Sequence, residues 1–117
     1  MRRRVLKLLE DVRAAGALIQ NYTSTVSEET FLESTLHSDA VQRRFEVIGE
    51  ALRKLRMEDP RLAERITGLQ QIVDFRNVLA HGYDVVDDSR VWRIAKSRLP
   101  RLMEEIETLL SEETGRE

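Results

Sequence analysis

The sequence predicts an all-α fold: an up-and-down antiparallel bundle of four main helices plus a short helix, with residues 1–117 forming a single domain. Three observations support this. Apolar residues recur every three or four positions along most of the chain, which is the period of an amphipathic helix. The alternation expected of strands is absent outside residues 84–86. The chain of 117 residues has only five Gly and two Pro, enough length for one hydrophobic core and few helix breakers.

The first periodic run covers residues 4–22 and predicts a first helix whose apolar stripe faces the core. The polar sequence TSTVSEET follows and is expected to be a loop. Within it, Ser27 is a plausible N-cap, because two glutamates follow it where the helix dipole favours acidic side chains. A short helix through Phe31 and Leu36 is predicted next.

The second long periodic run begins after a candidate N-cap at Ser38 or Asp39 and continues over residues 41–57. Apolar positions keep the helical spacing throughout this run. The pair Asp59-Pro60 is expected to end it, since proline cannot continue a helix that has already formed. This run therefore predicts a long helix in the middle of the chain.

The second half of the chain predicts a brief turn, a helix and a closing helix. The apolar stripe over residues 69–79 is followed by Gly82, which we expect to terminate the helix as a C′ residue. Asp87 or Asp88 is a candidate N-cap for the closing helix. Pro100 lies inside that helix and is expected to kink or split it. Short connections between these runs favour antiparallel neighbours.

Composition limits the classes of function. The absence of cysteine excludes disulfides and thiolate metal sites. The N-terminal sequence MRRRVLKLLEDVR is Arg-rich, but its acidic residues interrupt any signal-peptide core, and no run is long enough to cross a membrane. We therefore expect a soluble cytoplasmic protein. The net charge of −2 argues against a generally basic nucleic-acid coat, although it allows a local basic cleft.

The sequence RNVLAHGY collects polar chemistry at one helix end: Arg76, Asn77, His81 and Tyr83. A helix turns about 100° per residue, so Asn77 and His81 point away from the apolar stripe. Arg76 lies about 60° beyond the centre of that stripe and some 140° from His81. The two side chains therefore do not share a face of one ideal helix. The length of the arginine, the end of the helix or a second subunit would each allow them to meet.

Two interpretations of this helix end stay open from spacing alone. In the ordinary interpretation this is a solvated polar face, in which the arginine pairs with a carboxylate and the tyrosine packs at a turn. Alternatively, a histidine that titrates near neutrality can act as acid or base, and an adjacent arginine can hold a phosphoryl group. With no Cys and two His no metal site is predicted, which favours metal-independent RNA cleavage by the ribose 2′-hydroxyl. The other histidine, His37, is expected to be a capping or surface residue.

The run RNVLAHGY resembles the R-x4-H-x-Y signature of the HEPN superfamily, specifically the HepT-like toxins of prokaryotic toxin-antitoxin pairs. Residues 39–52, DAVQRRFEVIGEAL, are similar to that family's third helix. Residues 91–110, VWRIAKSRLPRLMEEIETLL, are similar to its closing helix, including the proline. The resemblance implies a HEPN-like helical homodimer in which the two motif-bearing helix ends meet in a shared cleft.

The resemblance also implies roles for individual residues. Arg76 and His81 would carry RNA cleavage, with Asn77 as the polar residue beside the arginine. Tyr83 would accept AMP from a cognate minimal nucleotidyltransferase, an antitoxin that uses ATP and Mg²⁺, whereas this chain would need no cofactor of its own. The added phosphate would bring negative charge to the site intended for RNA. The alternative is a noncatalytic helical interaction subunit that only docks a nucleotidyltransferase.

Four charged residues of the long middle run are possible supporting residues. Glu46 and Glu50 lie one helical turn apart around Gly49, which would allow another helix to approach closely. The two glutamates fit either salt bridging and interface packing or the positioning of the arginine. Arg43 and Arg44 fit either a widened basic cleft for RNA or ordinary solvated charge.

Overall fold

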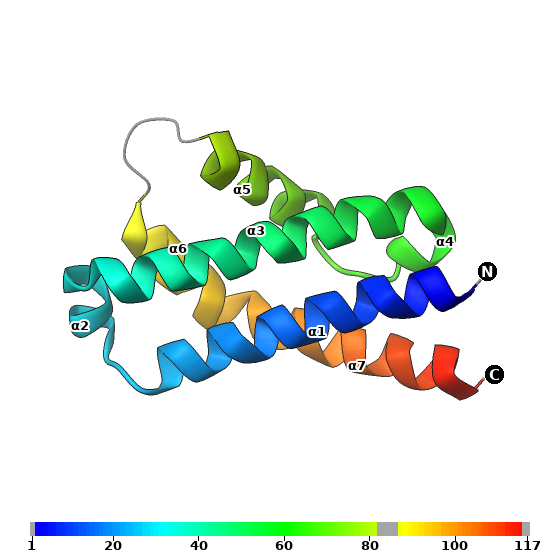
Figure 1. The fold of residues 1–117 in the computed structure, drawn as a ribbon, viewed down its shortest axis with the longest axis horizontal. Coiled ribbons are helices and arrows are strands. Elements are labelled where there is room, and N and C mark those ends of the chain that lie inside the picture. The colour runs from blue at the N-terminus through cyan, green and yellow to red at the C-terminus, as the bar shows by residue number, and fades with distance from the viewer. Residues whose placement is uncertain (1, 82–86, 116–117) are drawn as a thin grey trace.

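The computed structural model describes residues 2–81 and 87–115, with only the backbone described for Ala80 and His81. In this part of the chain all regular structure is helical (Figure 1). The helices are α1 (Arg2–Ser24), α2 (Glu28–Glu33), α3 (Thr35–Glu58), α4 (Pro60–Ala63), α5 (Leu69–His81), α6 (Asp88–Ser97) and α7 (Leu99–Gly115).

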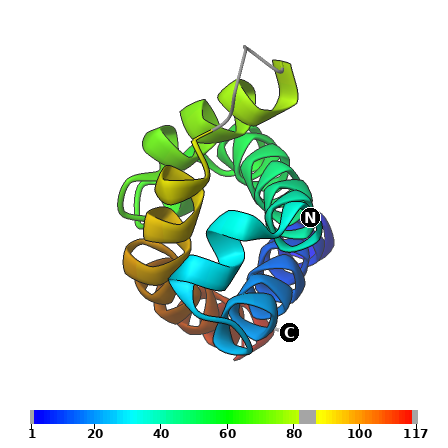
Figure 2. The same cartoon turned by 90° about the vertical axis from the view of Figure 1, so that its left-hand side faces the viewer.

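The long helices form an up-and-down bundle. Helices α1 and α3 are the main antiparallel pair; α5 packs on α3, and α7 packs on α1 (Figure 1). Consequently α1 begins and α7 ends at the same end of the bundle. The short helix α2 contacts α3 and α6 and covers the opposite end (Figure 2). The predicted all-α bundle of four main helices is confirmed, with α6 and α7 together forming the fourth.

The start of α3 differs from the prediction. Ser34 is the N-cap, and its hydroxyl oxygen accepts a hydrogen bond from the His37 backbone N–H at 3.2 Å. The predicted caps, Ser38 and Asp39, lie inside the helix. Ser38 is buried and donates to Asp88 Oδ1 at 2.5 Å. The predicted short helix accordingly ends at Glu33, and Leu36 belongs to the first turn of α3, where it is 78% exposed. The N-cap is the residue beside the first turn whose N–H groups lack partners within the helix, and that turn begins at Thr35 rather than after Ser38.

The other helix ends follow the local signals. Ser27 caps α2 by accepting from the Thr30 N–H at 3.1 Å, as predicted. The predicted turn after α3 contains the short helix α4, capped by Asp59. Asp87 caps α6, and the chain splits between α6 and α7 beside Pro100, as expected. The predicted stop at Gly82 and the alternation at residues 84–86 lie outside the described residues.

The core is a single cluster of apolar side chains drawn from every helix. Edge-on contact between Phe45 and Phe75, with ring centroids 5.4 Å apart, joins α3 to α5. Phe31 contacts Trp92 with centroids 5.2 Å apart, which joins α2 to α6. Such aromatic contacts add to the burial energy of the rings. Within the described ranges, no helix combines the length and apolarity that crossing a bilayer requires.

Candidate active site

Arg76 lies where α5 crosses α3, and a glycine makes the crossing possible. A Cβ atom added to Gly49 would lie 2.2 Å from Arg76 Cβ and 2.6 Å from its Cγ. Real side chains do not approach so closely, so only glycine fits here. The close approach expected at Gly49 is therefore observed, and its partner is the stem of the motif arginine.

The Arg76 guanidinium is held by groups on both helices. Its Nη2 lies 3.1 Å from Glu50 Oε2 on α3, and its Nη1 donates to Asn77 Oδ1 on α5 at 3.2 Å. Its Nε is buried and has no hydrogen-bond partner among the described residues. The side chain is 26% exposed, so the outer part of the guanidinium remains accessible. Glu50, rather than Glu46, is the carboxylate that contacts this arginine.

The Glu50 carboxylate is shared between two arginines. Its Oε1 accepts from Arg53 Nη2 at 2.6 Å and from Arg53 Nε at 3.1 Å. This hydrogen bonding to Arg53 lowers the pKa of Glu50, and the nearby charge of Arg76 lowers it further. Glu50 is therefore ionised at neutral pH and partly neutralises both guanidinium groups. Arg53 had no predicted role, although its position three residues after Glu50 on one helix was a usable signal.

A hollow of about 360 Å³ opens beside Arg76 on the surface of α1 and α3. Its charged lining is balanced, with three basic and three acidic side chains: Arg43, Lys54, Arg76, Asp11, Glu46 and Glu50. Arg43 Nη1 lies 3.6 Å from Glu46 Oε2, and Arg44 is half-buried on α3 outside this lining. Within one protomer the two predicted arginines therefore do not make this hollow basic.

The other motif residues lie at the end of α5. Asn77 is exposed and contacts Arg76 as described above. His81 is the last residue of α5, and its side chain lies outside the described part of the structure, as does Tyr83. The predicted convergence of arginine and imidazole thus remains a prediction. His37 Nδ1 lies 2.7 Å from Ser34 Oγ, so the second histidine takes part in the cap of α3.

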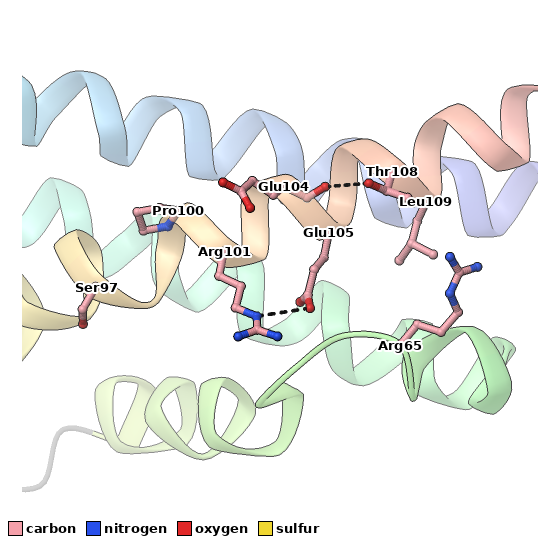
Figure 3. Close-up of a pocket in the computed structure, with 8 residues that line it drawn as sticks. All are labelled: Arg65, Ser97, Pro100, Arg101, Glu104, Glu105, Thr108 and Leu109. Atoms are coloured by element: carbon pink, nitrogen blue, oxygen red, sulfur yellow. Dashed lines mark hydrogen bonds and ion pairs between the residues drawn. The ribbon is translucent and has the colours of Figure 1, made fainter.

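A hollow of about 600 Å³ lies between α7 and the segment after α4, and no motif residue lines it (Figure 3). Both of its arginines lie beside carboxylates. Arg65 pairs with Glu112 at 2.6 Å, and Arg101 lies 3.6 Å from Glu105, whose carboxylate also accepts from the Thr67 N–H and hydroxyl. Across the described ranges no cluster of three His, Cys, Asp or Glu side chains is arranged to hold a metal ion.

The amino-acid sequence matches the family described as "Ribonuclease HepT-like" over residues 12–109, a range that contains the whole motif. The chain therefore belongs to the HepT-like ribonuclease family, which is of the HEPN type. The resemblance noted from the RNVLAHGY motif is confirmed. The helical bundle is that of a HEPN-like protein, and the prediction of an endoribonuclease is confirmed at the level of the family.

Two relatives illustrate the similarity. "Probable ribonuclease HepT" of Thermococcus cleftensis is 32% identical over 109 residues, covering 93% of this chain and 98% of the relative. "Gamma-glutamylcyclotransferase and putative RNase" of Methanocaldococcus jannaschii is 34% identical over 112 residues, covering 96% of this chain. This chain spans only 50% of that second relative's length. No solved structure matches the sequence.

Proposed function

We propose that this chain is the toxin of a cytoplasmic toxin-antitoxin pair, an endoribonuclease that cleaves RNA without a metal ion. Arg76 stabilises the phosphate under attack, His81 acts as acid or base, and Asn77 supports the arginine. The observation that carries the proposal is the arrangement around Arg76. A motif arginine is fixed against a second helix by Gly49 and Glu50, while part of its guanidinium stays exposed.

The chemistry requires these two side-chain types. In the proposed reaction the ribose 2′-oxygen attacks the adjacent phosphorus, the bond from phosphorus to the 5′-oxygen breaks, and a 2′,3′-cyclic phosphate and a 5′-hydroxyl result. One imidazole accepts the 2′-proton and a protonated imidazole gives a proton to the leaving 5′-oxygen. The guanidinium stabilises the negative charge that builds on the phosphate oxygens. Two copies of the chain in a homodimer supply two copies of His81.

Silencing follows from the position of Tyr83, two residues after His81. We propose that a partner minimal nucleotidyltransferase, using ATP and Mg²⁺, transfers AMP to the Tyr83 hydroxyl. The phosphate of AMP adds negative charge beside the proposed phosphate site, so modification and RNA binding exclude each other. The partner's ATP and Mg²⁺ are cofactors of the transfer and have no part in RNA cleavage.

The test compares RNA cleavage by purified wild-type, Arg76→Ala and His81→Ala proteins in the presence of a metal chelator. General acid-base catalysis contributes about 10²- to 10⁴-fold, so we expect His81→Ala to lose at least about 10²-fold in kcat. His37→Ala and Arg61→Ala are the matched controls, since each removes the same residue type at a position remote from Arg76. Circular dichroism verifies that every variant is helical. Undiminished cleavage by both motif variants would refute the assignment.

A second measurement separates the proposal from the noncatalytic alternative. The chain is produced with and without the product of its neighbouring gene, which we expect to be the nucleotidyltransferase, and the intact mass is determined. We expect wild-type protein to gain one or more AMP groups and Tyr83→Phe protein to gain none, with RNA cleavage lost only in the modified sample. A mass gain at Tyr83 in a protein that never cleaves RNA would favour a subunit that only docks its partner.

A further inference from the structure

Three arginines surround one hollow of about 430 Å³ between α5 and α6. Arg90 and Arg93 come from α6, and Arg98 follows it. All three are exposed, and the lining contains no acidic residue; the remaining lining residues are Gln71, Ile72, Phe75, Ile94 and Ser97. We call this feature the α5–α6 groove. Its charge differs sharply from that of the balanced hollow beside Arg76.

The positive charges of the three groove arginines are not neutralised by carboxylates of the described residues. The Arg93 guanidinium has no polar partner among the residues the structure describes, and Arg98 donates to the neutral side chain of Gln71. The Arg90 guanidinium lies over the Phe75 ring, 5.1 Å from its centroid. None of the three forms a salt bridge within the described residues. Elsewhere in the bundle, by contrast, arginines commonly pair with carboxylates; examples are Arg2, Arg4, Arg13, Arg53 and Arg65.

The geometry of the groove suits a chain of phosphates. Arg90 and Arg93 are three residues apart on α6, which places their Cβ atoms about 5–6 Å apart on one face of the helix. Each planar guanidinium can donate two parallel hydrogen bonds to one phosphate. Beneath them, Ile72 and Phe75 are buried and form an apolar floor. Ser97 also lines the groove, but its hydroxyl donates to the Arg93 carbonyl oxygen at 2.6 Å, so the arginines are the phosphate donors. A basic rim of this kind suits the phosphate backbone of a single strand.

We propose that the α5–α6 groove binds the phosphate backbone of the RNA substrate and holds it along the motif-bearing helix α5. This inference rests on the proposed function and adds a substrate-binding surface to it. Phe75, which forms part of the floor, is the residue directly before Arg76 in the sequence. The strand is therefore held within one helical turn of the motif arginine, on the α6 side of α5.

The test measures binding of a fluorescent single-stranded RNA with 2′-O-methyl riboses, which cannot be cleaved by attack of the 2′-oxygen. Anisotropy titrations over a salt series compare wild-type protein with the double variant Arg90→Gln/Arg93→Gln. The matched control is Arg3→Gln/Arg61→Gln, which removes the same charge from two exposed arginines whose guanidinium groups have no polar partner in the described residues. Thermal unfolding verifies that both variants fold. Arg93→Gln alone serves as a second variant, because Arg93 has no packing contact comparable to that of Arg90 with Phe75.

We expect the groove variant to bind RNA at least tenfold more weakly than the control. Each lost phosphate contact should also reduce the slope of log K against log salt by about 0.7, or about 1.4 for the pair. Arg93→Gln should give roughly half that change. If wild-type protein binds and cleaves RNA while the groove variants match the control, the groove inference is overturned and the proposed function stands.

Two other outcomes are informative. Wild-type protein that neither binds nor cleaves RNA would overturn both the groove and the proposed function. Groove variants that bind RNA normally but no longer bind the nucleotidyltransferase would overturn the inference in favour of an acidic protein surface as the occupant. The cleavage assay on His81→Ala is independent of the groove, so the two failures are distinguishable.

Discussion

Gly49→Ala is the substitution that most directly tests how the bundle positions Arg76. The added Cβ would lie 2.2 Å from Arg76 Cβ, whereas ordinary contact begins at 3.4 Å. The nearest obstructing atom is Arg76 Cβ, which is bonded directly to the helix backbone and cannot swing away as a side-chain tip can. Helix α5 must therefore move away from α3 by about 1 Å, or α3 must deform.

The expected cost follows from two opposing terms. Overpacking of this kind costs about 1–3 kcal/mol, and replacing glycine with alanine inside a helix returns about 1 kcal/mol. We expect Gly49→Ala to be destabilised by up to about 2 kcal/mol, a fall in Tm of up to roughly 10 °C for a domain of this length. Because a displacement of about 1 Å in a positioning element can cost on the order of 10²-fold in rate, RNA cleavage should fall by a similar factor.

Gly16→Ala is the matched control on α1. Its added Cβ would lie 2.3 Å from Met103 Sδ, the far end of a flexible side chain that can change rotamer. The helix-propensity gain then dominates, so stability should be unchanged or raised by up to about 1 kcal/mol, with cleavage intact. Thermal unfolding followed by circular dichroism, with cleavage assayed well below both melting temperatures, makes the comparison. Equal melting temperatures and equal cleavage rates for the two variants would refute the reasoning.

Three further outcomes are expected. Glu50→Gln should lower kcat about tenfold without raising KM, because Arg76 loses its ion-pair partner while the negative charge near the substrate decreases. Steady-state kinetics on RNA measure both constants, and a raised KM with unchanged kcat would contradict the prediction. The pKa of Asp59 is lowered, first by the Leu62 backbone N–H that it caps and then by Arg2. Its contribution to stability is therefore present above the unfolded pKa and is lost as the pH falls through the lower folded-state pKa. The fall of the urea midpoint at acid pH should accordingly be smaller in Asp59→Asn than in wild-type protein. Arg2→Gln should lower Tm by a few degrees, because Arg2 bridges Asp59 to the buried carboxylate of Glu113, and an unchanged Tm would show that the bridge contributes nothing measurable.

Helix positions were predictable from the sequence because burial and helical period are linked. Every residue of the stripe over residues 69–79 that was assigned to the core is buried, as Ile72, Phe75 and Leu79 show. The start of α3 was not predictable, because Ser34 and Ser38 are both good caps in isolation. Only the packing of α6 against α3, which gives Ser38 the Asp88 carboxylate as a partner, decides between them.

For the candidate site, the sequence predicted the direction in which each side chain leaves its helix but not the residues that it contacts. The angle that set Arg76 at the edge of the apolar stripe agrees with its half-buried position between α5 and α3. The sequence could not identify Glu50 as the partner of Arg76, because that depends on which turn of α3 faces α5. The α5–α6 groove was not predictable at all, since Arg90, Arg93 and Phe75 belong to helices whose relative placement is set by the whole core.

The two surfaces of α5 limit how an RNA strand can reach the site. Phe75, in the floor of the groove, and Arg76, which faces α3, are consecutive residues and diverge by about 100° around the helix. A strand held by Arg90 and Arg93 therefore lies on the α6 side of α5, and within one protomer α5 itself separates it from the hollow on the α1 and α3 side. The strand can pass between the two surfaces around the end of α5, where His81 lies, or continue onto a second protomer. The path around the helix end needs only one protomer. The path onto a second protomer requires the motif-bearing helix ends of two copies to meet, as the proposed homodimer does. RNA binding in the groove and dimer formation are therefore linked in the second path.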